Sequence, residues 1–443
     1  MSFPRYPGYK HSGVEWLGSV PSSWRRARFK EVFREREERS IAGEETLLSV
    51  SAYTGVTPRS EILDDGDHLS RAESLEGYKV CYPNDLVMNI MLAWNRGLGM
   101  SPLHGICSPA YSVFQVVDGS SSRYLHYLLR SDEYIRYFKA FSAGVIDSRL
   151  RLYPDAFGAL TTYLPSPREQ AQIAAFLDRE TAKIDALVAE QEQLISLLKE
   201  KRQAVICQAV TKGLDPSVPM KDSGVEWLGE VPAHWSAVRL KFLASDIKAG
   251  PFGSALTKDM YASSGYRVYG QEQVIPGDFS IGDYYIDEAT FAQLAQYATQ
   301  EGDVLISCVG TFGKIAVVPE SAELGIINPR LIRLRVVDKV SSSYLAEVLR
   351  STVTFEQFSV LSRGGTMDVI NIGTLSDIWV AVPPYSEQQS ILEKLQRLMR
   401  EFDALVDEAV LSIELLRERR SALISAAVTG QIDVRGWESM HVD

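Results

Sequence analysis

Several short motifs could carry catalytic chemistry, but each lacks a group that the chemistry needs. A methyltransferase that acts on a base amine needs Asp or Asn before a Pro-Pro-aromatic loop, because that polar side chain accepts a hydrogen bond from the amine. Here Pro383-Pro384-Tyr385 follows Val382, which is apolar. The glycine pairs at Gly97/Gly99 and Gly364/Gly365 do not extend to a GxGxxG turn. The sequence therefore predicts no methyltransferase site.

Nuclease, ATPase and metal chemistry are equally incomplete. The one tripeptide of nuclease type, Asp246-Ile247-Lys248, has no Pro-Asp shortly upstream, and no GxxxxGK[ST] phosphate loop is present. Six scattered histidines and four cysteines, Cys81, Cys107, Cys207 and Cys308, show no metal-ligand spacing. We interpret the chain as a binding protein that holds no catalytic residue, metal ion or cofactor of its own.

The length and charge limit what the chain binds. With 443 residues we expect two to four domains, and with a net charge of −11 we do not expect a protein that coats nucleic acid by bulk charge. No window approaches ~18 consecutive apolar residues, and the isolated cysteines fit a reducing compartment, so we expect a cytoplasmic location.

An internal duplication organises the chain. Residues Lys10–Lys30 and Lys221–Lys241 are identical at 13 of 21 positions at a constant offset of 211, including both tryptophans of each copy. A second repeat has an offset of 218, so that Glu169-Gln170 matches Glu387-Gln388 and Ala209-Val210-Thr211 matches Ala427-Val428-Thr429. Two ungapped repeats indicate the order segment, helix, segment, helix. We interpret Trp16, Trp24, Trp227 and Trp235 as packing residues of this repeated frame.

Each half ends in a long amphipathic helical pattern. Ser166-Pro167 and Glu169 form a helix start, and apolar residues then recur at steps of three, four and seven until Gly213. The second copy has the same periodicity up to Gly430. A rod with one apolar stripe must bury that stripe on something long, so we expect the two helices to pair as an antiparallel coiled coil with a pseudo-two-fold axis. The alternative is that each helix packs only on its own domain.

The segments between the helices have β-strand patterns interrupted by Gly, Pro and Asp. Expected strands lie at Tyr78–Val80, Asp85–Ile90, Tyr111–Val117, Asp303–Val309, Ile315–Val318 and Leu331–Val337, and helical stretches lie at Ser122–Ala140 and Ser341–Val360. Outside the flanking repeat the two segments hardly match. The fold class is therefore α/β (α+β): two different modules on two similar frames. Such a chain suits a protein that reads two different targets at a fixed distance.

The repeated motifs resemble one family. Ser12–Trp24 and Ser223–Trp235 both contain SGVEWLG, and each half leads through a P-x(3)-EQ start into a long helix. This order resembles the specificity subunit of type I restriction-modification enzymes, over essentially the whole chain. Further matches lie at Gly250–Ser254, Gly310–Lys314 and Gly364–Thr366, whereas the first segment matches only in outline, at Met91–Arg96 and Ser108–Tyr111.

The resemblance implies a domain organisation and a mechanism. It implies a first target-recognition domain within residues 1–165, a conserved helix at 166–213, a second recognition domain within 214–383, a conserved helix at 384–430 and a tail at 431–443. Each domain would read one half of a bipartite site in double-stranded DNA, and the helices would fix the spacer. Two methyltransferase subunits would bring S-adenosylmethionine, and motor-nuclease subunits would use ATP and Mg²⁺. We expect none of these cofactors to bind this chain.

Candidate DNA-contacting residues are polar or aromatic side chains in or beside Gly-containing loops. Arg pairs with guanine and Asn or Gln with adenine, whereas Lys, Ser and Thr position phosphates. For any one of them a solvated loop charge, a turn or a capped core group is an equal alternative. The candidates are Tyr53, Thr54, Arg59, Asn89, Trp94, Asn95, Arg96, Tyr111, Arg149 and Arg151 in the first segment, and Ser254, Thr257, Lys258, Tyr269, Gln271, Thr311, Lys314, Arg330, Arg363, Thr366 and Asn371 in the second.

Two other interpretations and two further expectations remain. The chain could be a coiled-coil scaffold with two protein-binding modules, or the specificity subunit of a related methylation-only or fused-nuclease system. The candidate recognition segments are neutral or acidic: residues 1–165 carry 19 basic and 19 acidic groups, and residues 221–383 carry 13 and 19. We therefore expect the isolated chain to bind DNA weakly and to depend on its partners. Pseudo-symmetry also predicts that Met1–Val20 pack beside the end of the second helix, as Leu214–Val231 pack beside the first.

Overall fold

A computed structural model describes residues 3–52, 54–61, 74–308, 314–361 and 370–437. The chain divides into two compact units, one made of Met1–Glu192 with Leu411–Asp443 and the other of Gln193–Val410. Within the described residues, no helix is both long and apolar enough to cross a membrane. The α+β class predicted from the sequence is confirmed, and each unit is described on its own below.

Unit 1 is built on an antiparallel sheet in the order β4-β11-β8-β9, covered by two short helices. Its helices are α1 Phe29–Val32, α2 Ser122–Arg130, α3 Asp132–Ala140 and α4 Pro154–Ala159. Its strands are β1 Tyr9–His11, β2 Ser19–Pro21, β3 Arg25–Arg28, β4 Phe33–Glu35, β5 Leu48–Ser51, β6 Gly55–Pro58, β7 Lys79–Cys81, β8 Leu86–Asn89, β9 Leu98–Met100, β10 Gly105–Cys107, β11 Tyr111–Val116 and β12 Thr161–Leu164.

Unit 2 repeats this sheet in the order β16-β23-β20-β21 and adds a second four-stranded sheet, β17-β19-β18-β22. Its helices are α6 Gln271–Val274, α7 Glu288–Gln293, α8 Ser342–Arg350, α9 Thr352–Leu361 and α10 Ile372–Ser376. Its strands are β13 Met220–Asp222, β14 Glu230–Pro232, β15 Ser236–Arg239, β16 Ala244–Ala249, β17 Tyr261–Ala262, β18 Tyr266–Tyr269, β19 Tyr285–Ile286, β20 Val304–Ser307, β21 Ile315–Val317, β22 Gly325–Ile327, β23 Leu331–Val336 and β24 Trp379–Val382.

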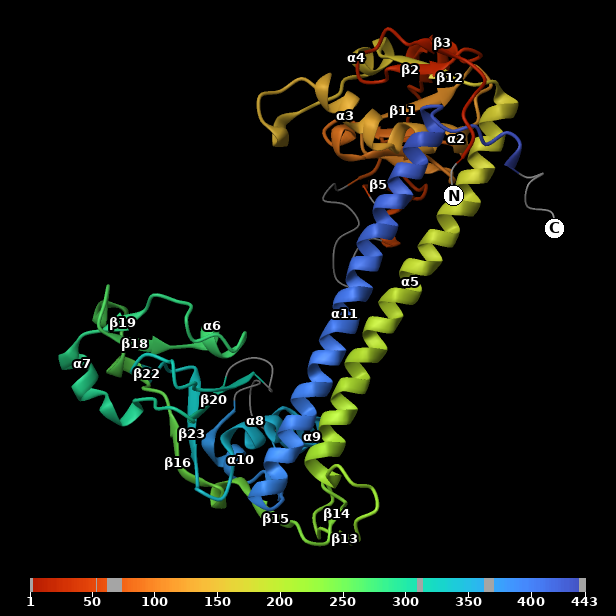
Figure 1. Cartoon of the computed structure of the whole chain (residues 1–443). Coiled ribbons are helices and arrows are strands. Elements are labelled where there is room, and N and C mark those ends of the chain that lie inside the picture. The colour runs from red at the N-terminus through yellow and green to blue at the C-terminus, as the bar shows by residue number, and fades with distance from the viewer. Residues whose placement is uncertain (1–2, 53, 62–73, 309–313, 362–369, 438–443) are drawn as a thin grey trace. The chain divides into compact units, whose positions relative to one another are not determined.

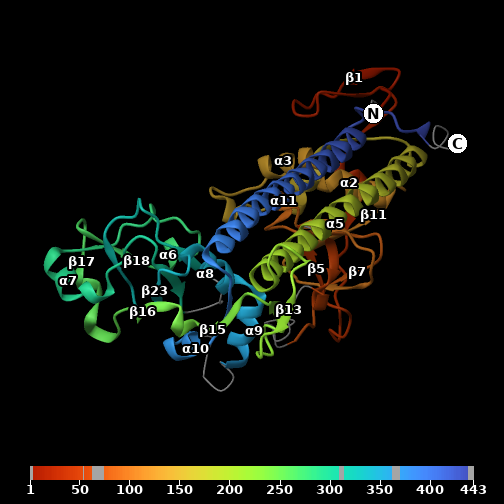
Figure 2. The same ribbon diagram turned by 60° about the horizontal axis from the view of Figure 1, so that its bottom comes forward.

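The two long helices, α5 Pro167–Lys212 and α11 Tyr385–Val428, pack side by side (Figures 1 and 2). In unit 1, Asp185 and Glu192 of α5 pair with Arg420 and Arg417 of α11. In unit 2, Arg202 of α5 pairs with Asp403 of α11. Partner numbers fall along one helix as they rise along the other, so the predicted antiparallel pairing is confirmed.

The duplication is retained in the buried hydrogen bonds of each unit. The side chain of Gln170, near the start of α5, accepts from the Ser121 amide and donates to the Pro165 carbonyl. Gln388, near the start of α11, accepts from the Ser341 amide and donates to the Pro383 carbonyl. Both glutamines are buried, so each one fixes a helix start against its own module.

The ends of the long helices are anchored in the same way. The Tyr124 hydroxyl of α2 donates to the carbonyl of Val428 at the end of α11, which lies beside α2 within unit 1 (Figure 1). The Tyr344 hydroxyl of α8 donates to the carbonyl of Val210 at the end of α5. Gly213 and Gly430 follow with φ of 75°, the left-handed conformation that ends a helix. A Cβ at Gly430 would also lie 2.4 Å from a Pro21 side-chain carbon, so the chain needs glycine there.

The N-terminal segment packs where pseudo-symmetry predicts. Tyr6, Leu17 and Val20 share a core with Ala427 and Val428 of α11. In unit 2, Val225, Leu228 and Val231 share a core with Ala209 and Val210 of α5. The prediction for Met1–Val20 is therefore confirmed for the described residues from Phe3 onward.

The helical stretches differ in one respect from the prediction. Each is broken into two helices, at Ser131 between α2 and α3 and at Ser351 between α8 and α9. Both serines are extended at ψ of about 150° and buried, and each hydroxyl donates to a carbonyl three residues earlier, of Leu128 and Val348. A serine hydroxyl that competes with the backbone in this way favours a helix end over continuation.

Candidate nucleic-acid interface

In unit 1, four of the ten candidate residues gather at one end of the main sheet, at the last residue of β8 and on its connection to β9. Asn89 is 5% exposed, and its side-chain oxygen accepts from the Met91 amide at 3.1 Å. The Trp94 indole donates to the Met91 carbonyl at 2.9 Å. These two side chains thus hold the loop, which leaves Asn95 exposed and Arg96 partly exposed at its tip.

Arg96 is held by the adjoining helices. Its backbone is left-handed, with φ of 59°, and its guanidinium pairs with Asp132 at the start of α3. The ammonium of Lys139, on α3, lies 5.1 Å from the centre of the Trp94 ring. The loop is therefore a positioned surface that carries both charge and an aromatic ring.

The other candidates of unit 1 border the same end of the sheet or a neighbouring hairpin. Tyr111, half-buried, is paired with Asn89 across β11 and β8. Arg149 is exposed and Arg151 half-buried, and the Leu152 amide that follows donates to the Ile90 carbonyl. Thr54 is exposed in the β5–β6 turn and Arg59 begins the 3-10 helix after β6, whereas Tyr53 lies outside the described residues.

In unit 2, Gln271 and Arg330 meet beside the end of β20. The Gln271 side chain donates to the Ser307 hydroxyl at 2.6 Å and accepts from Arg330 at 3.4 Å. They border a hollow of about 220 Å³, together with Tyr261, Tyr284 and Asn328. A small polar cleft with an amide and a guanidinium at its rim has the donor and acceptor types that read base edges.

The remaining candidates of unit 2 are dispersed. Ser254 and Lys258 are exposed in short 3-10 helices, Thr257 is half-buried between them, and Lys314 is exposed just before β21. The Asn371 side chain accepts from the Thr374 amide and caps α10. Thr311, Arg363 and Thr366 lie outside the described residues.

Tyr269 is the candidate that the structure places deepest. Its side chain is fully buried, its hydroxyl donates to the Glu323 carbonyl at 2.7 Å, and burial raises its pKa to about 12. With Asn89 and Asn371, it has a polar atom engaged in holding the fold. For the exposed candidates, contact with DNA stays a prediction.

The loops of the two units occupy equivalent frames. The Asn89 amide donates to the Gly97 carbonyl, and the Ser307 amide to the Lys314 carbonyl. The Leu152 amide donates to the Ile90 carbonyl, and the Ile370 amide to the Cys308 carbonyl. One backbone framework therefore presents different side chains in each unit.

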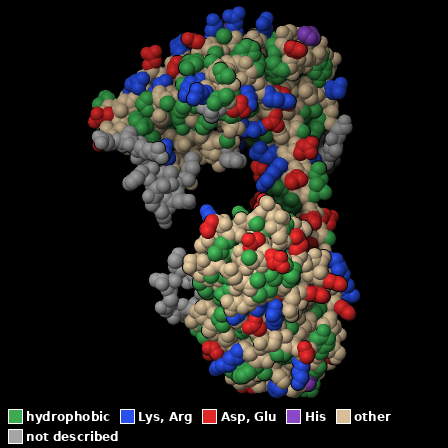
Figure 3. Space-filling model, turned by 90° about the vertical axis from the view of Figure 1, so that its left-hand side faces the viewer, with side chains coloured by type: hydrophobic (Ala, Val, Ile, Leu, Met, Phe, Trp, Pro, Cys, Tyr) green, Lys and Arg blue, Asp and Glu red, His purple; other side chains and the backbone are tan. Residues whose placement is uncertain are grey.

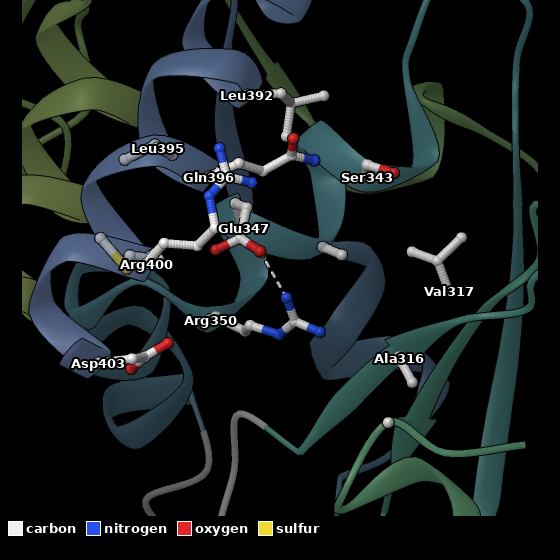
Figure 4. A pocket seen from close by; sticks show the side chains of 13 residues that line it. Ala316, Val317, Ser343, Glu347, Arg350, Leu392, Leu395, Gln396, Arg400 and Asp403 are labelled. Carbon is white, nitrogen blue, oxygen red and sulfur yellow. Dashed lines mark hydrogen bonds and ion pairs between the residues drawn. The ribbon is translucent and has the colours of Figure 1, made fainter. Parts of the chain in front are cut away.

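Basic and acidic side chains alternate over short distances on the surface of each unit. Figure 3 shows Lys and Arg interspersed with Asp and Glu on each unit. In unit 2, a hollow of about 470 Å³ lies between α8 and α11 and is lined by Arg350, Arg400, Glu347 and Asp403 among others. Figure 4 shows Arg350 directed at Glu347, with which it forms an ion pair. Such a mixed lining balances its own charges.

Sequence reasoning missed the basic residues on the helices. Asn95, Arg96 and Lys314 each line a hollow whose other walls include basic residues of the long helices. These helix residues repeat at the same offset of 218 that marks the duplication, so that Arg417 and Arg420 match Lys199 and Arg202. That signal was available in the sequence. Among the described residues, no group of three His, Cys, Asp or Glu side chains is placed to hold a metal ion.

The known proteins to which the chain is similar are specificity subunits of type I restriction enzymes. A family model described as "Type I restriction modification DNA specificity domain" matches residues 257–413. The EcoBI type I restriction enzyme specificity subunit of Escherichia coli is 22% identical over 384 residues, covering 83% of this chain and 77% of that one. The MjaVIII specificity subunit of Methanocaldococcus jannaschii is 23% identical over 278 residues, covering 61% and 62%.

Solved structures share the fold. A chain from a study of the assembly and conformational transition of the type I R-M system has a TM-score of 0.69 at 17% identity, covering 92% of this chain and 98% of that one. The HsdS subunit of Thermoanaerobacter tengcongensis has a TM-score of 0.54 at 18% identity, covering 93% and 98%. The fold of two modules and two long helices is therefore shared with these structures.

Proposed function

We propose that this chain, which belongs to the family of type I restriction-modification specificity subunits, selects the DNA site of a restriction-modification complex and leaves the chemistry to its partners. Each unit would read one half of a bipartite site in double-stranded DNA. The observation that carries this proposal is the duplicated framework with unlike loops, because it presents two different sets of side chains from one scaffold.

The helix pair would set the spacer between the two half-sites. Each unit has one ion pair between the helices, Asp185 with Arg420 in unit 1 and Arg202 with Asp403 in unit 2. The two aspartates, and likewise the two arginines, are 218 positions apart, so the register of α5 against α11 is specified twice. A fixed register gives a fixed number of base pairs between the bases that are read. Lengthening both helices by equal insertions should therefore lengthen the spacer without changing either half-site.

The chemistry would come from other chains. We propose that two methyltransferase subunits dock on the helices and bring S-adenosylmethionine to an adenine in each half-site. Motor-nuclease subunits with ATP and Mg²⁺ would complete the restriction complex. Two copies of the methyltransferase fit the two-fold repetition of the frame, because each copy would meet the same surface.

The test is to map methylated adenines in DNA from cells that express the chain with its methyltransferase. We expect one asymmetric site with two half-sites and a constant spacer. Asn95→Ala with Arg96→Ala should relax one half-site, and Gln271→Ala with Arg330→Ala should relax the other. Arg397→Ala is the matched control, because Arg397 is an exposed residue of α11 that pairs only weakly, at 4.0 Å, with Glu401.

Two results would contradict the proposal. One is the absence of sequence-specific duplex binding by the reconstituted complex, even at low salt. The other is a change in both half-sites when one unit is altered, because each unit would then not read on its own.

A further inference from the structure

A hollow in unit 1 gathers cationic side chains from three separate elements. It has a volume of about 530 Å³, and four arginines line it: Arg96 on the β8–β9 loop, Arg130 at the end of α2, and Arg417 and Arg420 on α11. One acidic residue, Asp132, lies among the lining residues. Three of these arginines also pair with carboxylates: Arg96 with Asp132, and, just outside the lining, Arg417 with Glu192 and Arg420 with Asp185. The lining itself still has an excess of positive charge in a chain of net charge −11.

Unit 2 has a hollow of the same size and charge. It also measures about 530 Å³ and is lined by Lys314 on the β20–β21 connection, Arg350 at the end of α8, and Lys199 and Arg202 on α5. Glu347 is the one acidic residue of its lining. The lining again has four cations and one anion, and two of the cations are paired, Arg350 with Glu347 and Arg202 with Asp403 outside the lining.

The two hollows correspond residue by residue on the helices. Arg417 and Arg420 lie 218 positions after Lys199 and Arg202, the offset of the helix repeat. Arg130 and Arg350 are both the last residues of nine-residue helices. Arg130 donates to the Leu98 carbonyl of β9 at 2.7 Å, and Arg350 to the Ile315 carbonyl of β21 at 2.6 Å. A basic cluster that is kept while the surrounding loops diverge indicates a ligand common to both units.

The fourth cation of each hollow stands on a recognition loop. Gly97 in unit 1 and Lys314 in unit 2 are equivalent, because their carbonyls accept the matching backbone hydrogen bonds, from Asn89 and Ser307. Arg96 therefore lies one position before the equivalent of Lys314 on the same connection. Each hollow thus joins a candidate recognition loop to a long helix.

The neighbouring cations affect one another. In unit 1, burial together with the charges of Arg96 and Arg420 lowers the pKa of Arg130 to about 10. Burial, followed by the charges of Arg130 and Arg123, lowers the pKa of His126 in the same wall to about 4. An anion placed there would relieve this repulsion, because it would add an opposite charge close to Arg130 and His126.

We propose that each hollow binds a phosphodiester of the DNA backbone beside the half-site that its unit reads. The proposal rests on the proposed function and adds the group that holds the DNA in register. Guanidinium forks bind phosphate oxygens in pairs, and such contacts fix position without reading sequence. We call the basic lining of each hollow a phosphate clamp. Because the two hollows are equivalent, the same kind of clamp would hold the DNA at both halves of an asymmetric site.

The experiment measures duplex affinity of the chain reconstituted with its methyltransferase, over a range of salt concentrations. The variants are Arg417→Gln with Arg420→Gln for unit 1, and Lys199→Gln with Arg202→Gln for unit 2. We expect each pair to weaken binding roughly ten-fold and to reduce the slope of log affinity against log salt by about one to two. Cognate and non-cognate DNA should be affected alike, and the methylated sequence should not change.

The matched controls are Lys201→Gln and Arg419→Gln. Both residues are exposed, adjacent to Arg202 and Arg420 and 218 positions apart, but neither lines either of the two basic hollows. Each control removes one positive charge from the same helix but outside the hollows, where no phosphate is proposed to bind, so each should leave the salt slope nearly unchanged. Because Arg420 and Arg202 also pair with Asp185 and Asp403, the Lys double variants of Arg417 and Arg420 provide a second test. They keep the charge and should restore most of the affinity.

Three outcomes decide between the possibilities. If both double variants bind DNA with the affinity and the salt slope of the wild-type complex, the clamp is overturned and the proposed function stands. Failure of the wild-type complex to bind any specific duplex would instead overturn the proposed function. Saturable binding of inorganic phosphate to the isolated chain, lost in the double variants and without effect on DNA affinity, would assign the hollows to a free anion and also overturn the clamp.

Discussion

The two units differ most clearly where a shared residue has different neighbours. In unit 1 the Glu169 carboxylate accepts a hydrogen bond from the Trp24 indole at 3.0 Å. In unit 2 the equivalent Glu387 pairs with His234 at 2.8 Å, and the buried Nε1 of Trp235 makes no hydrogen bond with any residue that the structure describes. Packing of the tryptophan is therefore conserved between the units, whereas its polar partner is not.

Packing of the buried tryptophans therefore contributes more to the repeated frame than their polar contacts do. Trp24 and Trp235 are both buried, at 1% and 0% exposure. Of the other two repeated tryptophans, Trp16 packs on the core of unit 1, whereas Trp227 is half-exposed at 36%. The interpretation of the repeated tryptophans as frame residues holds best for the second of each pair.

The largest effect is expected from removal of residues 1–20. The deletion takes Tyr6, Leu17 and Val20 out of the core at the end of α11, which should cost unit 1 about 5 kcal/mol or more of folding free energy. Hydrogen exchange should then show loss of protection in α2 and the end of α11, and methyltransferase docking should weaken. Normal assembly and protection in the truncated chain would contradict the circular arrangement.

Truncation of the buried tryptophans should come next. Trp24→Ala and Trp235→Ala should each cost about 3–5 kcal/mol, because both remove a large, fully packed side chain. Denaturant unfolding monitored by hydrogen exchange can assign each loss to its own unit. Similar costs would support packing as the common element, whereas a loss confined to Trp24→Ala would show that the Glu169 hydrogen bond dominates.

The pH dependence should differ between the units because of His126. Ala346 stands at the equivalent position in unit 2. Because the folded pKa of His126 is about 4, below its unfolded value of about 6.5, the unfolded chain binds more protons between these values. Unit 1 should therefore keep its full stability above pH 6.5 and lose about 2 kcal/mol between pH 7 and pH 5.

Hydrogen exchange at pH 7 and pH 5 gives the measurement, with unit 2 as the internal reference. His126→Gln should abolish the difference, because glutamine has no proton to gain. A wild-type unit 1 that is as stable at pH 5 as at pH 7 would contradict the buried, neutral state of His126.

The smallest effect separates the two tryptophan environments. Trp24→Phe leaves the buried Glu169 carboxylate without its donor, whereas Trp235→Phe removes an indole that donates to no described residue. We expect Trp24→Phe to cost about 1–2 kcal/mol more than Trp235→Phe, the range of a hydrogen bond to a charged group. Equal costs in thermal unfolding would show that the hydrogen bond adds nothing to stability.

Much of the fold could be predicted from the sequence. The duplication, the two long helices and their antiparallel pairing follow from repeat offsets and a heptad-like apolar stripe, and the strands at Asp85–Ile90, Tyr111–Val117 and Leu331–Val337 follow from local patterns. The breaks at Ser131 and Ser351 were not predicted, because a serine that ends a helix and one that continues it look alike without tertiary contacts. The five-part division of the chain into domains stays a prediction.

The candidate site was predicted less completely. Loop positions such as Arg96, Gln271 and Arg330 could be chosen by residue type and glycine content. Burial could not, so Tyr269 and Asn89 were included although the fold places them in the interior. The helix cations Arg417 and Lys199 were omitted because their charge looks like any solvated helix face until a second element is packed opposite.

The sequence alone determined the organisation: what repeats, what diverges, and that catalytic motifs are incomplete. These properties depend on residue identity and spacing along the chain, which are one-dimensional. Only the tertiary structure decided which charges meet, because Arg96, Arg130 and Arg420 come from three separate elements. Arg130 lies more than 30 residues after Arg96, and Arg420 lies nearly 300 residues after Arg130. The net charge of −11 is a sum over the whole chain, whereas affinity for a phosphate depends on the few charges that the fold brings within reach of it.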